Sequence, residues 1–280
     1  MEVVRTIAGL RDALAPWRRA GEPIGLVPTM GALHAGHMAL AGAARAGCGR
    51  VVATIFVNPR QFAPSEDLGS YPRREAADLE MLRAAGVDLA FVPPGEEIYP
   101  PGFSTLVRVT GLSEGLCGAR RAGHFDGVAT VVTKLLVQAL PDAAYFGEKD
   151  YQQLMIVRQL ARDLDIPVRI EGVATFREPD GLALSSRNAY LSPAERRTAP
   201  ILARVLQGIA AALARQPAAV VRELRRGIAE LEAAGFAVDY LEIREARTLT
   251  PVIAAIAAPS RVFAAAYLGR TRLIDNMPVA

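Results

Sequence analysis

The amino-acid sequence predicts an α/β fold, in which a parallel sheet with helices on both faces is followed by a smaller α+β domain. Over roughly the first 175 residues, runs rich in β-branched and apolar residues alternate with alanine- and leucine-rich stretches of helical length. This alternation is typical of a parallel sheet. The pattern then changes, because two long helical stretches precede two strand-like runs.

The strands and helices are expected in the following order. β-Branched and apolar runs predict strands in the first part at residues 24–28, 51–57, 87–92, 143–146 and 168–173. Alanine- and leucine-rich runs predict helices at residues 40–46, 74–85, 127–139 and 151–164. In the second part, helices are expected at residues 193–215 and 218–234, and strands at residues 238–244 and 261–268. Ligands of such sheets bind beyond the carboxyl ends of the strands.

A polar segment, residues 177–192, separates the two patterns and contains Pro179, Asp180 and Gly181. We therefore expect domains at residues 1–175 and 176–280. A hinge beside the crevice of the sheet is also able to contribute residues that bind a ligand.

Composition excludes several classes of protein. The 280 residues are 51% hydrophobic and 22% charged, and the formal net charge is only +3 without a basic stripe, so nucleic acid is not the expected partner. Charged residues or proline interrupt the apolar stretches, and the amino terminus lacks the pattern of a signal peptide, so no membrane span and no export are expected. Cys48 and Cys117 are the only cysteines. A reducing cytoplasm is therefore the expected location.

Two histidines follow the first predicted strand in the run Pro28-Thr-Met-Gly-Ala-Leu-His-Ala-Gly-His37. At the start of a helix, His34 and His37 lie on one face near unpaired backbone N–H groups, which favours binding of phosphate. Gly31 and Gly36 would let a ligand approach the backbone. The alternative is a pair of solvated or core histidines beside a packing glycine.

Two later segments also carry polar side chains in promising places. Phe146-Gly-Glu-Lys-Asp-Tyr-Gln-Gln153 follows a predicted strand, where Lys149 can neutralise phosphate and Asp150 can cap a helix or bind a ribose hydroxyl. Asp180-Gly-Leu-Ala-Leu-Ser-Ser-Arg-Asn188 offers hydroxyls and a guanidinium from a loop. Taken singly, the first segment is better explained as an exposed charged turn, and an ordinary interdomain loop explains the second as well as function does.

Two further turns have weaker signals. Asn58-Pro-Arg-Gln-Phe62 follows the second predicted strand, so the amide of Gln61 is expected at the same sheet edge. The turn before residue 127 contains His124, for which structural and functional interpretations stay open.

Together, five ordered segments resemble the pantothenate synthetase family, also called pantoate:beta-alanine ligases. They are residues 28–37, 55–62, 123–132, 146–153 and 180–188. The resemblance covers nearly the whole chain, although Ala122 and Ala174 stand where the family pattern has proline. It implies a Rossmann-like nucleotidyltransferase domain that binds nucleotide and pantoate, a smaller carboxyl-terminal lid domain, and a homodimer.

The resemblance also implies the reaction. Pantoate would attack the α-phosphorus of ATP to give pantoyl adenylate and pyrophosphate, and the amine of beta-alanine would then displace AMP to give pantothenate. Positioning and stabilisation of phosphate charge would be the main tasks of the protein. ATP is therefore expected as a substrate, with Mg²⁺ bridging its phosphate oxygens; the protein ligand of this ion is unknown from the sequence.

Residue roles carry over motif by motif. His37 matches the family's proton donor, His34 would donate to the phosphates, and Lys149 would compensate transition-state charge. Gln61 and Gln153 match amides that bind pantoate, and Gln61 would also lie near beta-alanine. Residues matching ATP-binding positions are Met30, Gly31, Ala32, Leu33, His34, Ala35, Gly36, His37, Gly147, Glu148, Lys149, Asp150, Phe176, Leu184, Ser185, Ser186 and Arg187. Without the resemblance, Phe176 would be assigned to the core.

Two other functions remain open at this point. One is a different His-x-Gly-His nucleotidyltransferase whose product keeps the adenylyl group. The other is a regulatory protein that binds nucleotide without turnover, because fold alone does not determine function. The two glutamines and the paired serines favour the ligase over the first, and the histidines with Lys149 favour it over the second.

Overall fold

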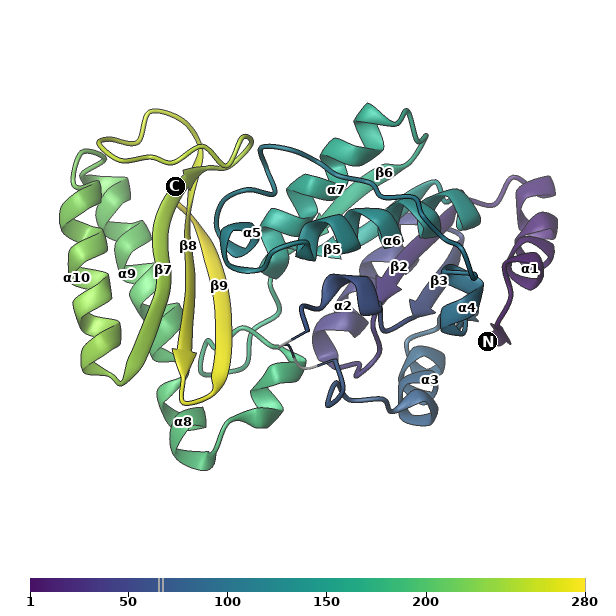
Figure 1. The fold of residues 1–280 in the computed structure, drawn as a ribbon, viewed down its shortest axis with the longest axis horizontal. Coiled ribbons are helices and arrows are strands. Elements are labelled where there is room, and N and C mark those ends of the chain that lie inside the picture. The colour runs from purple at the N-terminus through teal and green to yellow at the C-terminus, as the bar shows by residue number, and fades with distance from the viewer. Residues whose placement is uncertain (65, 67, 280) are drawn as a thin grey trace. The chain divides into compact units, whose positions relative to one another are not determined.

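The computed structural model describes residues 1–64, 66 and 68–279. Within them the chain forms two compact units, shown in Figure 1. The first unit consists of Met1–Glu114, Gly118–Glu148 and Gln153–Ala174. The second consists of Gly115–Cys117, Lys149–Gln152 and the chain from Thr175 onward.

A six-stranded sheet forms the centre of the first unit, with the strand order β1-β4-β3-β2-β5-β6. All its described pairings are parallel. The strands are β1 (Glu2–Val4), β2 (Ile24–Thr29), β3 (Arg50–Ile55), β4 (Leu89–Phe91), β5 (Ala143–Gly147) and β6 (Arg169–Val173). The chain runs outward from β2 through β3 and β4, and then resumes at β5 on the other side of β2. The order of strands therefore reverses between β2 and β5, and such a switch point is where sheets of this kind bind ligands.

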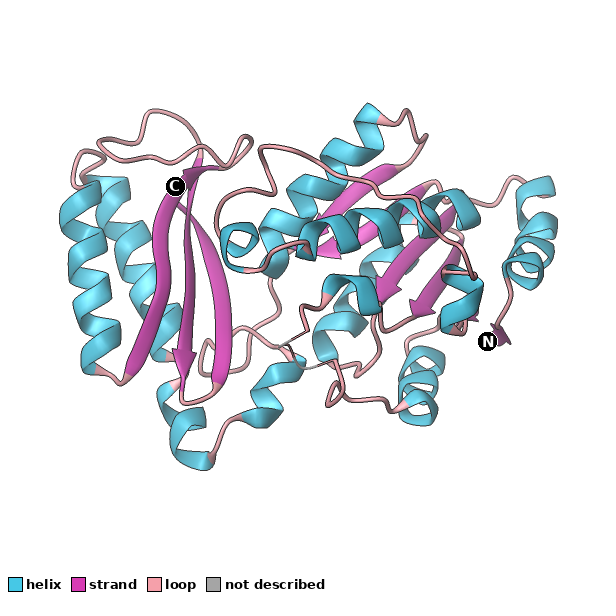
Figure 2. Ribbon diagram, viewed as in Figure 1, coloured by secondary structure: helices cyan, strands magenta, loops and turns pink. Residues whose placement is uncertain are grey.

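Helices connect these strands, as the cyan ribbons in Figure 2 show. They are α1 (Ile7–Arg19), α2 (Ala35–Gly47), η1 (Pro59–Gln61), α3 (Glu75–Ala84), α4 (Gly95–Ile98), α5 (Cys117–Arg120), α6 (His124–Ala139), η2 (Glu148–Asp150) and α7 (Tyr151–Asp163). An apolar cluster that includes Val27, Ala41, Val51 and Leu82 packs α2 and α3 against the sheet. This packing fixes the start of α2 at the carboxyl end of β2.

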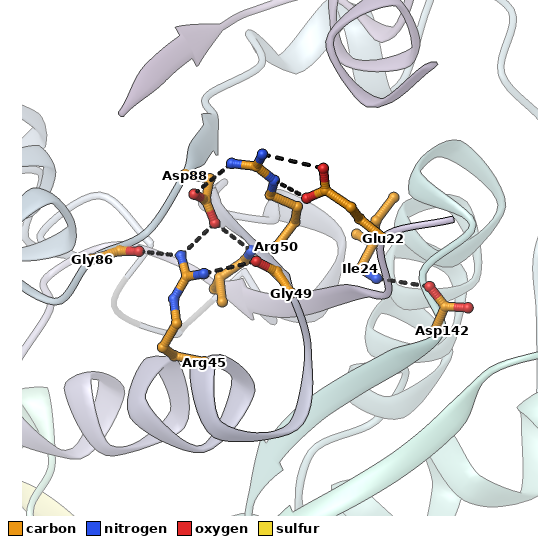
Figure 3. Close-up of polar contacts among 9 residues, drawn as sticks. Glu22, Ile24, Arg45, Gly49, Arg50, Gly86, Asp88 and Asp142 are labelled. Atoms are coloured by element: carbon orange, nitrogen blue, oxygen red, sulfur yellow. Dashed lines mark hydrogen bonds and ion pairs between the residues drawn. The ribbon is translucent and has the colours of Figure 1, made fainter. Parts of the chain in front are cut away.

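The amino ends of the strands are tied together by two carboxylates (Figure 3). Asp88 accepts a hydrogen bond from the backbone N–H of Val51 at 2.7 Å and also contacts the guanidinium groups of Arg45 and Arg50. Asp142 accepts from the backbone N–H of Ile24 at 2.7 Å. These bonds lie at the opposite ends of the strands from the switch-point crevice, so they hold the sheet without entering a ligand site.

The second unit is built on an antiparallel three-stranded sheet with the order β7-β8-β9. Its elements are η3 (Ser186–Tyr190), α8 (Pro193–Thr198), α9 (Ile201–Arg215), α10 (Val220–Ala233), β7 (Phe236–Glu245), β8 (Ser260–Leu268) and β9 (Thr271–Val279). Helices α9 and α10 lie side by side against this sheet (Figure 1). Their apolar faces bury residues such as Leu206, Ile209 and Leu231 against Val262 and Ala264.

The predicted fold class is confirmed, and the five predicted strands of the first part and the two of the second are present within a few residues of the expected bounds. The single helix expected at residues 193–215 is wrong: Pro200, which has no N–H to donate, separates α8 from α9. The elements that were not anticipated include β1, α1 and β9. The first is only three residues long, α1 contains Pro16, and β9 carries Asp275 and Asn276 in its interior.

No helix within the described ranges is both long and apolar enough to cross a membrane.

Candidate functional site

The loop between β2 and α2 is held in an unusual backbone conformation by a buried carboxylate. Gly31 has φ +78° and Ala32 has φ +51°, both in the left-handed region. Asp78 of α3, only 3% exposed, accepts from the backbone N–H of Ala32 at 2.9 Å and of Leu33 at 2.8 Å. A Cβ on residue 31 would lie 3.0 Å from the Asp78 carboxylate, so the close approach requires glycine.

The two histidines of this loop cap α2 with their own side chains. The Nδ1 atom of His37 accepts from the backbone N–H of His34 at 3.3 Å, and Nδ1 of His34 accepts from the N–H of Gly36 at 3.2 Å. The expectation of unpaired N–H groups beside the histidines is therefore wrong for these two, because the imidazoles occupy them. The ring centroids are 4.1 Å apart, so the two side chains lie together, as expected.

These two bonds fix the tautomer of both rings. A nitrogen that accepts from a backbone N–H presents its lone pair, so in each neutral imidazole the proton resides on Nε2. Both histidines therefore carry an Nε2–H donor at the amino-terminal end of α2, His34 as its N-cap and His37 in its first turn. A pair of such donors beside a helix amino terminus suits an anion such as phosphate.

The carboxyl end of β5 leads into the second predicted segment. Because β2 and β5 are paired neighbours, Gly147 ends a strand beside the one that leads to His34. A Cβ at Gly147 would have nothing within 4 Å, so space adjoins its backbone. Lys149 follows in η2, with its side chain 17% exposed and its ammonium 3.9 Å from the carboxylate of Asp150. At that distance the ion pair is loose.

Gln61 lies buried at the carboxyl end of β3, with both ends of its amide engaged. Its Oε1 accepts from Asn58 Nδ2 at 3.0 Å, and its Nε2 lies 3.0 Å from the sulfur of Met30. Asn58 is held in turn by the hydroxyl of Tyr99, which donates to Asn58 Oδ1 at 2.8 Å. Burial raises the pKa of Tyr99 to about 12, although the nearby charge of Arg60 acts in the opposite direction. The phenol therefore remains a hydrogen-bond donor at neutral pH.

His124, for which two interpretations were open, braces the backbone of Gln61. Its Nδ1 lies 2.8 Å from the Gln61 carbonyl oxygen, which only accepts, so Nδ1 carries the proton. Its Nε2 then accepts from Arg121 at 2.8 Å. Arg121 also forms two bonds to Glu66, at 2.6 and 2.8 Å. His124 is therefore placed to hold Gln61.

Close packing reinforces the same turn. A Cβ on Gly127 of α6 would lie 2.2 Å from the carbonyl oxygen of Arg60, so helix and turn meet backbone to backbone. The carbonyl of Gly127 also accepts from Asn58 Nδ2 at 3.1 Å. Glycine at this position thus fixes where Gln61 lies.

The adjacent glutamines of α7 have different environments. Gln152 is buried, accepts from the backbone N–H of Cys117 at 3.1 Å and donates to the carbonyl of Gly115 at 2.8 Å. Gln153 is half-buried. Gln152 therefore has a structural role, while Gln153 stays the candidate for substrate binding.

The loop at residues 176–188 belongs to the second unit and is ordered by hydrogen bonds along its own backbone. Leu184 donates from its N–H to the carbonyl of Phe176 at 3.0 Å, and the hydroxyl of Ser185 accepts from the N–H of Arg187 at 3.3 Å. Phe176 is 44% exposed, so its assignment to the core is wrong. The strand-like pairing around Arg177 and Ala183 leaves the Phe176 ring on the surface of the loop.

The expected ATP-binding residues are thus divided between the two units. The first unit holds residues 30–37, Gly147 and Glu148, together with Gln61 and Gln153. The second holds Lys149, Asp150, Phe176 and residues 184–187. Both sets include backbone held in place by buried polar side chains.

Sequence reasoning missed the residues that support the site, above all Asp78, Asn58 and Tyr99. A weak signal existed for Asp78, because it stands four residues before the buried Leu82 and so shares the inward face of α3. A carboxylate on an apolar face requires a buried partner. That partner, the backbone of Ala32 and Leu33, lies 45 or more residues away in sequence.

Known proteins of one family are similar to this chain over its whole length. The family model described as pantoate-beta-alanine ligase matches residues 2–278. Pantothenate synthetase from Paramagnetospirillum magneticum is 55% identical over 280 residues, which cover 100% of this chain and 98% of the relative. That from Rhizorhabdus wittichii is 56% identical, covering 100% and 99%.

Solved structures agree as well. The crystal structure of pantothenate synthetase from Thermus thermophilus is 49% identical, with a TM-score of 0.94 over 100% of this chain and 99% of that one. Pantoate-beta-alanine ligase from Francisella tularensis, crystallised with beta-gamma ATP and beta-alanine, is 33% identical, with a TM-score of 0.82 over 100% and 98%. The chain therefore belongs to the pantoate-beta-alanine ligase family.

Proposed function

We propose that the residues described above carry out the reaction of this family on this chain: the ATP-dependent joining of pantoate and beta-alanine by an amide bond. In the first step a pantoate carboxylate oxygen attacks the α-phosphorus of ATP, and the bond from that phosphorus to the bridging oxygen of pyrophosphate breaks. In the second, the amine nitrogen of beta-alanine attacks the acyl carbon, loses a proton, and AMP departs with the former carboxylate oxygen.

The observation that carries the proposal is the pair of Nε2–H donors on His34 and His37 at the start of α2. As the bond to pyrophosphate breaks, negative charge grows on the leaving oxygens. Donors that are already oriented stabilise such charge without reorganising during the reaction. We assign His37 as the donor to the reacting phosphates and His34 as its neighbour on the same triphosphate.

Lys149, Ser185, Ser186 and Arg187 supply the remaining positive charge and hydroxyl donors in this proposal. An ammonium acts as a point charge on phosphate, whereas a guanidinium binds two oxygens at once. The loose contact between Lys149 and Asp150 favours this role, since little has to be broken for the ammonium to bind phosphate. The second unit, which contributes these residues, then acts as a lid on the nucleotide.

Gln61 and Gln153 are proposed to bind pantoate. The contacts of Gln61 support this role. His124 contacts its backbone carbonyl, and Asn58 donates a hydrogen bond to its side-chain amide oxygen. A preoriented amide binds the hydroxyl and carboxylate groups of a small acid with little loss of side-chain entropy. Beta-alanine is proposed to bind beside the same amide.

The proposal also includes the metal ion, the oligomeric state and the cellular location. We propose that Mg²⁺ enters with ATP on its phosphate oxygens, as this ion prefers oxygen ligands and retains water. The described residues contain no group of three or more His, Cys, Asp or Glu side chains able to hold a metal ion. A homodimer in the cytoplasm is proposed from the family resemblance, and the free thiols of Cys48 and Cys117 are compatible with a reducing compartment.

The deciding experiment follows pyrophosphate and AMP separately. With ATP, magnesium and pantoate, the protein is expected to release a burst of pyrophosphate of about one equivalent per site. Addition of beta-alanine converts the burst to steady formation of AMP and pantothenate. Release of pyrophosphate without pantoate, or a product that keeps the adenylyl group, would overturn the assignment.

A further inference from the structure

Strand β9 carries two adjacent buried polar residues that pattern alone would place in a loop. Asp275 is 3% exposed and Asn276 is 2% exposed. A polar side chain buried in a strand destabilises the fold unless its hydrogen bonds are satisfied. One partner of each, Arg177 for Asp275 and Lys149 for Asn276, belongs to a segment that holds proposed phosphate-binding side chains.

Asp275 holds the loop that precedes Ser185. Its two carboxylate oxygens accept from Arg177, Nη1 at 2.7 Å and Nη2 at 2.9 Å, in a bidentate pair. Arg177 Nη1 also donates to the carbonyl of Gly181 at 3.0 Å, and Arg177 pairs with Ala183 across the turn. The position of the turn that leads into residues 184–187 is therefore set from Asp275.

Asn276 holds the backbone of Lys149. Its Nδ2 donates to the Lys149 carbonyl at 2.9 Å, and its Oδ1 accepts from Arg261 Nε at 2.7 Å. The guanidinium of Arg261 in turn lies 4.1 Å from the centroid of the Tyr151 ring, two residues beyond Lys149. With one end of the amide accepting and the other donating, its orientation is fixed.

Asp275 and Asn276 contact these two segments from opposite faces of strand β9. Successive side chains of a β-strand point to opposite faces, so Asp275 and Asn276 reach in opposite directions. They are linked by the N–H of Asn276, which donates to Asp275 Oδ1 at 2.8 Å. The strand is itself paired with β8 along its whole length. It therefore acts as a stiff spacer between the two segments.

We propose that Asp275 and Asn276 are positioning residues, which set the distance between Lys149 and the Ser185, Ser186 and Arg187 loop during formation of the adenylate. The inference rests on the proposed function of those four residues. Groups that act together on the departing pyrophosphate must be correctly spaced, and a misplacement of about 1 Å can cost about a hundredfold in rate. The second step has no pyrophosphate to hold, so it depends less on this spacing.

The test compares the two half-reactions in Asp275→Asn and Asn276→Asp. The first substitution turns amide N–H groups toward an Arg177 nitrogen, and the second places two acceptors face to face at the Lys149 carbonyl. We expect adenylate formation, measured as pantoate-dependent pyrophosphate release, to slow at least tenfold in each variant. Release of AMP from supplied pantoyl adenylate and beta-alanine is expected to change less than threefold, with the KM for pantoate unaltered.

Asp239→Asn is the matched control. Asp239 of β7 also pairs with an arginine of β9, Arg272, at 2.7 Å, whereas Asp275 pairs with Arg177 of the loop before Ser185. Both half-reactions should keep wild-type rates in this variant. Arg177→Lys tests the same contact if a β9 variant fails to fold. It removes the bidentate pair with Asp275 by changing Arg177, which is the more exposed partner.

The outcomes separate the inference from the proposed function. Equal slowing of both half-reactions would overturn the positioning role. Adenylate formation at the wild-type rate in variants that keep the wild-type melting temperature would overturn it as well. Lys149→Ala tests the function on which the inference rests. If that variant forms adenylate at the wild-type rate, the role of Lys149 is wrong; if it is slow while the β9 variants are fast, only the positioning role is wrong.

Discussion

Replacing Asp78 with asparagine tests whether a buried carboxylate on α3 sets the conformation of the loop that leads to His34. The wild-type carboxylate accepts from two consecutive backbone N–H groups, those of Ala32 and Leu33. Asparagine has the same shape but only one acceptor oxygen. Its amide nitrogen would therefore face one of the two N–H groups, donor against donor.

The magnitude follows from these two bonds. A hydrogen bond to a charged group contributes about 1.5–3 kcal/mol, and one of the two is lost in Asp78→Asn. The left-handed conformation of Ala32, with φ +51°, costs about 1–2 kcal/mol. In the wild-type protein, the hydrogen bond that Asp78→Asn removes offsets this cost. A loss of about 2 kcal/mol corresponds to a factor of about thirty in the population of the native loop.

We therefore expect kcat/KM for ATP to fall between about tenfold and a hundredfold, with the unfolding free energy lower by about 1–3 kcal/mol. The assay is initial-rate pyrophosphate release at varied ATP, combined with urea unfolding. The KM for pantoate should change little. Glu75→Gln is the matched control, because Glu75 also stands in the first turn of α3 but pairs with Arg5 on the surface.

A stable Asp78→Asn protein with wild-type kcat/KM for ATP would refute the reasoning, because the loop would then hold its conformation without the second acceptor. Loss of activity in Glu75→Gln of the same size would also count against it. In that case the charge at the start of α3, rather than the two hydrogen bonds, would be responsible.

Four further predictions address other parts of the molecule. His37→Ala should slow pyrophosphate release by about a hundredfold or more with little change in melting temperature, and a near-normal rate would remove this ring from the mechanism. Gln61→Ala should raise the KM for pantoate far more than that for ATP in initial-rate assays; equal changes contradict its assignment. Asp88→Asn should lower the unfolding free energy by about 1–3 kcal/mol and leave both half-reactions unchanged, since its bonds lie at the far ends of the strands. Burial alone would raise the pKa of the Glu66 carboxyl, but bonds and charge from Arg121 lower it below its usual value of 4.5. The stabilisation by Glu66 is therefore complete above that value and lost as pH falls through the lower pKa of the folded protein, so Glu66→Gln should flatten the acid side of the curve of unfolding free energy against pH.

Prediction from the sequence was most accurate where the pattern is local. Strands of the first unit are runs of apolar residues, and the pairing of His34 with His37 follows from helical spacing, so both were predictable. Helix α1 was not predicted, although its buried residues Leu10 and Leu14 stand at helical spacing, because Pro16 in its last turn obscures the signal. Strand β9 was not predicted because Asp275 and Asn276 interrupt its apolar pattern. Their partners lie 98 and 127 residues away in the sequence.

By itself, the sequence determined the class of fold, most of its strands and the family, and it indicated the candidate site residues, because these depend on spacing and residue type within short segments. Only the tertiary structure decided which groups hold those residues in place. Asp78, His124 and Asn276 act on backbone atoms that are distant in sequence. A backbone carbonyl or N–H leaves no mark in the residue letters, so such contacts are defined only once the chain has folded.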